Sequence, residues 1–541
     1  MGRIRVGYID RSFREVMRYP GDAGHLVTIS PTGGGKGRDV LIPALLDVSS
    51  KDTSALIVDP KGQLASVTGP QAARMGKRVI MLNPFNIWPE CIGPGAARFR
   101  GFEKLCTLDG AYNPMSTLNP ASDNFVPDAE ALGQSIVYQQ NEGEHWTDSA
   151  RDLVTGLIMY ASVYGEPAEK NLSWVRRTIC NRKRLFEIAG KFFGEDAMTE
   201  AEDFIQQKLG RFGEPEANEN KEIGSIISTA VTQTSFIGNG AISKSLSQSS
   251  FLFNALRERP TNIYLILPGR RLKTCSRWFR LIVGSALNEL MEEQRERGLP
   301  VLFLLDEFAQ LGPLKAIEDG FGIARDYGLL LWPVIQDLNQ LKRDYKDSWE
   351  TMLANAGMLQ FFRPQDNTTA EYISKRTADV VVDRGVKKRL SQNPMNPESG
   401  MNISLEPDWK EKKYLEPWEV REIGTDEFLL FAAGKNGVHR GARRSYLETP
   451  EFQGLYAPDP YHPDQLPPKS PQPQPANDNR GKAAANDNRG GNQPARPDSV
   501  METAIRNAGE VQTEKEILSE IAEYDKRVDE KFGPRRSWWK R

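Results

Sequence analysis

The stretch TISPTGGGKGRDVLIPALL, residues 28–46, decides the fold of this chain. It joins a short apolar strand to a segment of helical spacing through three glycines and Lys36. Phosphate-binding loops are built this way because glycines let backbone N–H groups turn toward phosphate oxygens, while the lysine reaches the β- and γ-phosphates. The stretch therefore predicts a nucleotide site whose binding residues are Thr32, Gly33, Gly34, Gly35, Lys36, Gly37 and Arg38.

Two positions depart from the standard loop. Ser30 occupies the place of the first glycine, and Gly37 follows the lysine, where a Ser or Thr hydroxyl ordinarily contacts magnesium. A glycine-rich turn that carries a solvated lysine is therefore the alternative interpretation. The rest of the chain has to decide between the two.

A second signal is the acidic end of a later apolar run. VLFLLDE, residues 301–307, leads directly into Asp306 and Glu307. Unpaired buried charge is costly, so a buried strand seldom ends in two carboxylates without a use for them. In a P-loop ATPase the first carboxylate orients magnesium and the second polarises the attacking water. We assign Asp306 to the metal and Glu307 to catalysis, the alternative being a solvated strand end with a helix cap.

A third strand end supplies a candidate sensor. LLLWPVIQDLNQL, residues 329–341, places Gln336 where the strand leaves the sheet. A neutral amide at this position can hydrogen-bond a γ-phosphate or a water molecule and report hydrolysis to the next helix. The alternative is an ordinary polar residue at a strand end.

The apolar patterning predicts an α/β architecture with an insertion. Runs at 25–30, 54–60 and 78–84 each end in a turn signal, as buried parallel strands do. We expect residues 1–125 and 251–450 to form the two parts of one nucleotide-binding domain, and residues 126–250, with helical spacing, to form an inserted all-helical domain. Residues 451–500 resemble a disordered Pro/Asn-rich linker. Residues 501–541 combine an amphipathic helix with the basic-aromatic tail RRSWWKR.

Composition limits the partners. The chain has 541 residues and a net charge of −2, so nucleic-acid contacts must be confined to local patches. Residues 269–280 and 383–389 are basic clusters of this kind, unless each is a solvated helix face. The cysteines are scattered and form no CxxC pair, which indicates reduced thiols and no zinc site. No apolar run approaches the roughly 20 residues of a spanning helix.

The order of several motifs resembles the coupling proteins of type IV secretion systems, the TraG-like conjugative DNA transfer family. These motifs are SPTGGGKG with VLIPALL, IVDPKGQLA (57–65), VIMLNPF (79–85), YNPMSTLNP (112–120), LLDEFAQLG (304–312) and the segment after Gln336. The resemblance spans roughly residues 20–447. It implies a RecA-like P-loop ATPase, α/β in class, with an inserted all-α domain, ATP and Mg²⁺ as cofactors, and a hexamer as the active form.

The resemblance also carries expectations about the site and the partners. A glycine often follows the loop lysine in this family, so Gly37 does not argue against ATP, and Thr32 is a candidate helper. Arg325, in GIARDYGL, lies where the family places an arginine finger, the alternative being a surface salt bridge. The partners implied are single- and double-stranded DNA, a relaxase within its relaxosome, effector proteins, and the channel ATPases and inner-membrane components of the secretion system.

The usual N-terminal membrane helices of the family are missing from this sequence. We therefore expect a cytoplasmic protein, peripheral at most to the inner membrane. Two other functions remain open at this stage: a low-turnover nucleotide-binding adaptor between relaxosome and channel, and a cytosolic DNA translocase unconnected with secretion.

Overall fold

The computed structural model describes residues 3–20, 24–87, 106–107, 110–138, 145–194, 199–217, 219–291, 298–391, 402–434 and 437–462. The predicted terminal helix and the tail (501–541) lie outside the described residues, as does most of the predicted linker. Residues 451–462 are described, and they pack on the folded chain: the Ala457 N–H donates to the Val67 carbonyl at 3.0 Å, and Phe452 and Tyr456 are buried. The linker prediction is therefore wrong for these residues.

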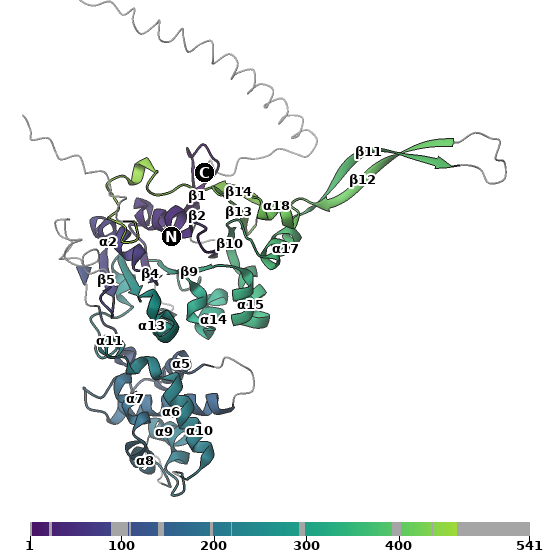
Figure 1. Ribbon diagram of the computed structural model, residues 1–541. Coiled ribbons are helices and arrows are strands. Elements are labelled where there is room, and N and C mark those ends of the chain that lie inside the picture. Colours follow the sequence, from purple (N-terminus) through teal and green to yellow (C-terminus); the bar gives the residue numbers. More distant parts are fainter. Residues whose placement is uncertain are drawn as a thin grey trace, which may run out of the picture. The chain divides into compact units, whose positions relative to one another are not determined.

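Within the described residues, the main sheet has 12 strands in the order β2-β1-β14-β13-β10-β3-β9-β8-β4-β7-β5-β6 (Figure 1). Neighbours from β10 through to β6 are parallel, whereas β13, β14, β1 and β2 continue the sheet antiparallel. The parallel strands are β3 (His25–Ile29), β4 (Ser54–Asp59), β5 (Arg78–Leu82), β6 (Cys106–Thr107), β7 (Thr261–Ile266), β8 (Val301–Leu305), β9 (Leu329–Ile335) and β10 (Ala356–Phe361). The buried strands predicted from apolar runs are confirmed.

The antiparallel strands were not all expected. β13 (Glu427–Ala432) coincides with a predicted run, but β1 (Arg3–Tyr8), β2 (Val16–Pro20) and β14 (His439–Ala442) carry arginines and glycines that hide the strand pattern. A separate two-stranded ribbon, β11 (Asp379–Ser391) with β12 (Asn402–Lys413), extends away from the sheet (Figure 1). The basic cluster at 383–389 thus lies in a strand, which corrects the helix-face alternative.

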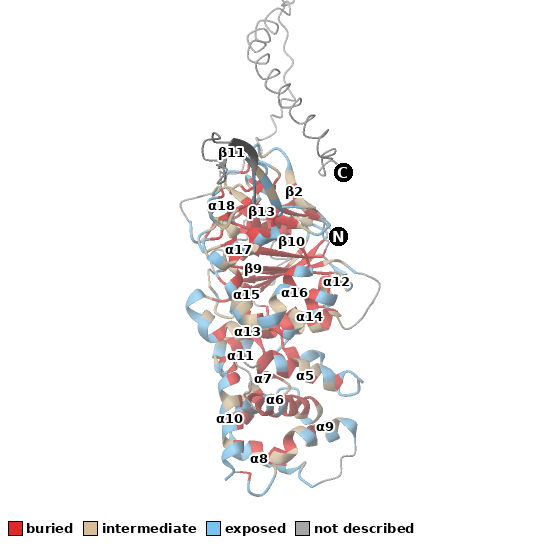
Figure 2. Cartoon of the chain, turned by 90° about the vertical axis from the view of Figure 1, so that its right-hand side faces the viewer, coloured by how far each residue is buried: buried red, intermediate tan, exposed pale blue. Residues whose placement is uncertain are grey.

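The sheet is buried on both faces, which explains the continuous apolar runs. Side chains of alternate residues enter two cores: Val27 and Ile29 belong to one, and Leu26 belongs to the other. Figure 2 shows the strands at the centre of the sheet in the colour of buried residues. Helices that pack around this sheet are α1 (Ile42–Leu46), α2 (Gln63–Arg74), α13 (Leu272–Met291), α14 (Lys315–Ile323), α15 (Leu338–Tyr345), α16 (Trp349–Ala354), α17 (Asn367–Arg376) and α18 (Pro417–Arg421).

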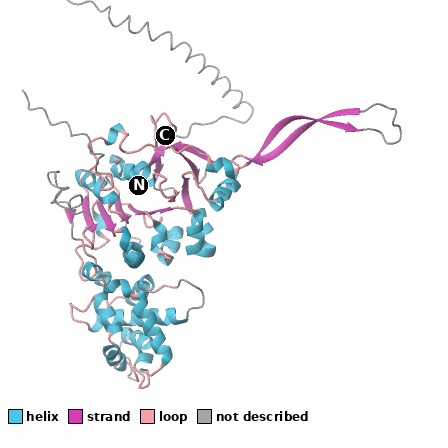
Figure 3. Ribbon diagram, in the orientation of Figure 1, coloured by secondary structure: helices cyan, strands magenta, loops and turns pink. Residues whose placement is uncertain are grey.

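Between β6 and β7 the described chain contains helices and no strand (Figure 3). They are α5 (Phe125–Ile136), α6 (His145–Tyr164), α7 (Leu172–Cys180), α8 (Arg182–Gly190), α9 (Glu200–Leu209), α10 (Lys221–Gln233), α11 (Gly240–Ser245) and α12 (Ala255–Glu258). The buried face of α6, with Leu153, Leu157 and Ile158, packs against α5, α9 and α10. The same core continues into the sheet, so the boundaries 126 and 250 of an inserted domain stay a prediction.

No helix of the described ranges combines the length and the apolar character needed to span a bilayer.

Candidate functional site

The glycine loop lies at the carboxyl edge of the sheet, between β3 and the helical turn Gly37–Leu41 that continues into α1. Gly33 has φ 75° and Gly35 has φ 82°, values in the left-handed region where a side chain is strained. These two glycines are therefore required by the backbone path. Thr32, directly before them in the loop, is exposed.

Four of the predicted residues meet at this edge. The Nζ of Lys36 lies 2.9 Å from Asp306 Oδ1 and 2.9 Å from Glu307 Oε1. The amide Nε2 of Gln336 donates to Glu307 Oε2 at 2.9 Å. These contacts arise because β3, β9 and β8 are adjacent and parallel, so that their carboxyl ends coincide.

The electrostatics of this cluster depend on pairing. Burial alone would lower the pKa of Lys36, but the charges of Asp306 and Glu307 outweigh burial and raise it. Burial alone would raise the pKa of Glu307, whereas Lys36 and the amide of Gln336 hold it below its ordinary value. Lys36 and Glu307 are therefore both charged near neutral pH and form an ion pair.

Glu307 has an unusual backbone. Its φ of 54° and ψ of 45° are left-handed, a conformation that costs about 1–3 kcal/mol for a residue with a side chain. The turn aims its carboxylate at Lys36 and Gln336 and starts the short helix Phe308–Leu311. Such strain at a strand end is characteristic of functional sites.

A third carboxyl group lies on the neighbouring strand. Asp59 ends β4 and is fully buried, and burial raises its pKa to about 7, with Asp306 adding to the effect. Its Oδ2 accepts the Ala65 N–H at 2.8 Å, which fixes the start of α2 relative to the sheet. Sequence reasoning quoted this motif but gave Asp59 no role.

Arg443 is a residue that sequence reasoning missed. Its guanidinium donates to the Gly34 carbonyl and to the Thr425 carbonyl, and lies 3.1 Å from Asp39 Oδ2. It also stacks over Phe362 at 4.6 Å. Arg443 is more than 400 positions away from the loop in the chain, so no local pattern signals the contact.

Asp39, the carboxylate beside Arg443, also pairs with Arg38 directly after the glycine loop. Asp39, buried after the loop, also accepts from Arg38 Nε at 2.6 Å. The side chain of Arg38 is 58% exposed, whereas that of Arg443 is 6% exposed. Asp39 thus pairs with one solvated and one buried arginine beneath the glycine loop.

Arg325 lies away from the cluster that Lys36 forms with the acidic strand end and Gln336 in the same chain. It follows α14, which returns the chain from the end of β8 to the start of β9, and its side chain is 60% exposed with Asp326 at 3.9 Å. Its charge acts on His25, the first residue of β3, whereas the glycine loop follows the last residue of β3. A strand of five residues separates the two edges by about 16 Å.

The basic cluster at 269–280 divides into core and surface. Trp278 and Phe279 are fully buried, and Arg280 is buried with its Nε donating to the Ser135 carbonyl at 3.0 Å. These three belong to the packing of α13 and not to a nucleic-acid surface, which corrects that part of the prediction. Lys273 and Arg277 instead face a cleft of about 880 Å³.

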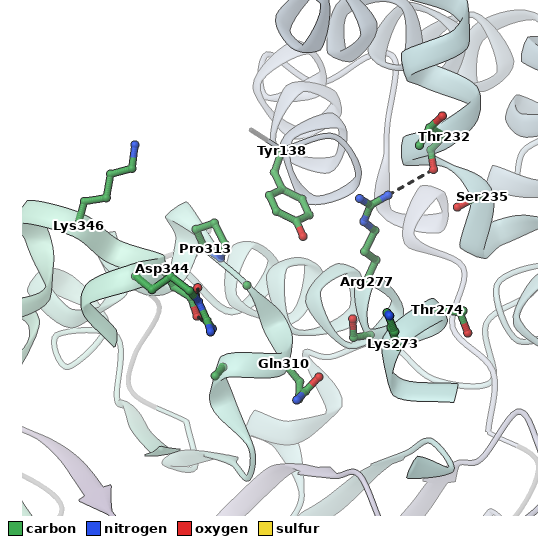
Figure 4. A pocket seen from close by; sticks show the side chains of 14 residues that line it. Tyr138, Thr232, Ser235, Lys273, Thr274, Arg277, Gln310, Pro313, Asp344 and Lys346 are labelled. Atoms are coloured by element: carbon green, nitrogen blue, oxygen red, sulfur yellow. Dashed lines mark hydrogen bonds and ion pairs between the residues drawn. The ribbon is translucent and has the colours of Figure 1, made fainter. Parts of the chain in front are cut away.

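This cleft lies between the helices of residues 110–238 and the sheet region (Figure 4). Tyr138 and Thr232 form one wall, and Gln310 belongs to the turn directly after Glu307. Its charged lining residues are Lys273, Arg277, Arg343, Asp344 and Lys346, and the cleft is therefore predominantly basic.

The loop and the acidic strand end suit a magnesium–nucleotide complex. Magnesium takes one or two protein oxygen ligands and completes its shell with phosphate oxygens and water. The described residues hold no preformed group of three or more His, Cys, Asp or Glu around a metal position. Asp306 at the strand end, with the glycine loop beside it, fits that sparse requirement.

Comparisons with known proteins agree with this geometry. The sequence profile of the family described as Type IV secretory system Conjugative DNA transfer matches residues 7–94 and 102–464. The chain is 25% identical over 433 residues to the conjugal transfer protein TraG of Rhizobium radiobacter, covering 77% of this chain and 61% of TraG. It is 27% identical over 375 residues to the protein VirD4 of Rhizobium radiobacter, covering 66% of this chain and 48% of VirD4. The chain thus spans about half to three fifths of these relatives.

Solved structures show the fold. The plasmid coupling protein TrwB in complex with ADP and Mg²⁺ superposes with a TM-score of 0.56 at 15% identity, covering 84% of this chain and 97% of TrwB. An unbound form of TrwB gives a TM-score of 0.56 at 16% identity, covering 82% and 88%. The predicted RecA-like P-loop fold is confirmed. With the profile matching most of its length, the chain belongs to the Type IV secretory system Conjugative DNA transfer family.

Proposed function

We propose that this chain is an ATP-hydrolysing coupling protein that recruits DNA, as a relaxase-bound single strand, and effector proteins to a type IV secretion channel. The observation that carries the proposal is the contact set of Lys36 with Asp306 and Glu307, and of Glu307 with Gln336, beside the glycine loop. TraG and VirD4 relatives, and a TrwB neighbour solved with ADP and Mg²⁺, support the same reading.

The residues have distinct roles in the proposed reaction. Lys36 leaves its two carboxylates to contact the β- and γ-phosphates, with N–H groups of Gly33, Gly34 and Gly35 around them. Glu307, freed from Lys36, polarises the attacking water, while Gln336 contacts that water or the γ-phosphate. Mg²⁺, held by Asp306, neutralises charge on the phosphates when bound.

We propose that Arg325 acts on the site of a neighbouring subunit. Its exposure and its place at the far edge of the sheet support a finger supplied in trans within a ring, which we take to be a hexamer. Such fingers contribute roughly 10³–10⁵ in rate in systems where they are known. Turnover would then require assembly.

The basic cleft is the proposed contact for the phosphate backbone of single-stranded DNA. Two elements connect it to the catalytic cluster: the turn with Gln310 follows Glu307, and α15, which ends next to Lys346, follows Gln336. Backbone phosphates bound there would bias both elements. This arrangement favours DNA-stimulated hydrolysis over a passive adaptor.

The test is ATP hydrolysis by the full chain with and without single-stranded DNA, beside Lys36→Ala and Glu307→Gln. Turnover that rises with DNA and is lost in both variants is the expected result. Tight ATP binding without turnover, at concentrations where rings form, would instead support the adaptor. DNA-stimulated turnover that no channel component or relaxase alters would support the unconnected translocase.

A further inference from the structure

Gly37 leaves the loop without the hydroxyl that ordinarily contacts magnesium, and the structure shows what stands beside it. The carboxamide oxygen Oε1 of Gln63 lies 3.9 Å from the position that a Cβ would take at residue 37. Among the described residues other than its chain neighbours Lys36 and Arg38, no further side chain comes within 4 Å of that position. An amide oxygen from a different element therefore faces the place of the missing hydroxyl.

The orientation of this amide is fixed from behind. Gln63 Nε2 donates to Asp459 Oδ2 at 2.7 Å, and Asp459 is 3% exposed. A carboxylate accepts hydrogen bonds and donates none, so it selects the NH₂ side of the amide. The amide oxygen of Gln63 consequently points toward Gly37. Asp459 also accepts from the Tyr461 N–H at 2.9 Å and the Tyr446 hydroxyl at 3.4 Å, which hold it in place.

The backbone that carries Gln63 is equally constrained. Gln63 is the first residue of α2, and Gly62 before it has φ 69°, which a residue with a side chain rarely adopts. Asp59 binds the start of the same helix through the Ala65 N–H. The turn from β4 into α2 thus presents Gln63 to the loop at a set position.

We propose that Gln63 takes the part of the absent loop hydroxyl as an oxygen donor toward the Mg²⁺ of a bound nucleotide, directly or through one of its water ligands. Magnesium prefers hard oxygen ligands, and carboxamide oxygens are among them. Asp459 acts as the positioning residue. The assignment rests on the proposed function as a magnesium–nucleotide binder and adds a residue from outside the P-loop and the acidic strand end.

The test measures the affinity of the full chain for a fluorescent ADP analogue in excess EDTA and in excess Mg²⁺. We expect Gln63→Ala to reduce the affinity gained from Mg²⁺ by about tenfold, the size seen when groups around a metal are removed. Affinity in EDTA should stay unchanged, which also shows that the variant is folded. Asp459→Asn should give a smaller loss of the same kind, because it removes only the orientation of the amide.

A variant that restores the loop hydroxyl tests the assignment most directly. Space at residue 37 admits a side chain, so Gly37→Ser should return the Mg²⁺-dependent gain to the Gln63→Ala background. A Gln63→Ala variant that loses affinity equally in EDTA and in Mg²⁺, or loses none, would overturn the assignment while leaving nucleotide binding intact. Failure of the unmodified chain to bind the analogue under either condition would overturn the proposed function and this assignment together.

Discussion

The contact between Arg443 and Asp39 predicts a measurable coupling energy beneath the glycine loop. The two side chains are 6% and 4% exposed and lie 3.1 Å apart, with the Gly34 and Thr425 carbonyls as further acceptors of the arginine. Removing one partner of a buried pair costs about 3–5 kcal/mol because the other charge stays buried and unpaired.

Two features of the structure reduce this value for Arg443→Gln. Asp39 keeps its contact with Arg38 at 2.6 Å, so its charge is not left alone. The Nε of Arg443 is buried without a hydrogen-bond partner among the described residues, so its removal relieves a cost. We therefore expect a loss of about 3 kcal/mol in the free energy of unfolding, at the lower end of the range.

The assay is urea unfolding of the full chain and of three variants: Arg443→Gln, Asp39→Asn and the double variant. Since both single changes break the same contact, the double variant should lose less than their sum, by about 1.5–3 kcal/mol. Arg440→Gln, an exposed arginine on β14, is the matched control and should change stability by less than about 0.5 kcal/mol. Additivity of Arg443→Gln and Asp39→Asn within about 0.5 kcal/mol would refute the reasoning.

Three further predictions follow from other parts of the chain. Burial lowers the pKa of Lys77 to about 7, so between about pH 7 and 10 the unfolded state binds more protons than the folded state and stability rises with pH. Lys77→Met should remove this slope of up to about 1.4 kcal/mol per pH unit, measured by urea unfolding at several pH values. An unchanged slope in the variant would contradict the prediction. If Arg325 acts in trans, Lys36→Ala and Arg325→Ala should each be inactive alone yet regain ATP hydrolysis when mixed, whereas silent mixtures would argue against a shared site. Lys273→Ala with Lys346→Ala should weaken single-stranded DNA binding and reduce the salt slope by about 0.7 per lost phosphate contact, while Lys183→Ala, 88% exposed on α8, should not.

Local patterns were enough for the central sheet and for its carboxyl edge. The runs ending at Ile29, Leu305 and Ile335 are short and largely apolar, as strands buried on both faces are, and every residue of the three strands is buried. Because adjacent parallel strands end at one edge, the residues after them had to meet. The sequence grouped Lys36, Asp306, Glu307 and Gln336 by the chemistry of a P-loop ATPase, and the adjacency of β3, β9 and β8 brings them together.

Patterns failed where a residue's neighbour comes from a distant segment. Trp278 and Phe279 look like an aromatic supplement to a basic cluster, but the helix turns them into the core. β1 reads as a polar segment because it carries arginines and a glycine, yet residues 4–8 are all buried in the fold. β14 reads as polar for the same reason, and it is buried only at Gly441 and Ala442. A side chain's surroundings in these cases depend on packing partners that the local sequence does not contain.

The sequence by itself determined the loop, the acidic strand end and the buried strands that carry them, since glycine conformation and strand burial are local requirements. Only the tertiary structure decided which groups surround the loop. Arg443 and Asp459, both more than 390 positions from their partners in the chain, fix Gly34 and Gln63. Arg325 lies at the edge of the sheet opposite the glycine loop because α14 leads the chain from the end of β8 back to the start of β9. These are consequences of chain topology, because a hydrogen bond or a charge acts across space without regard to separation along the sequence.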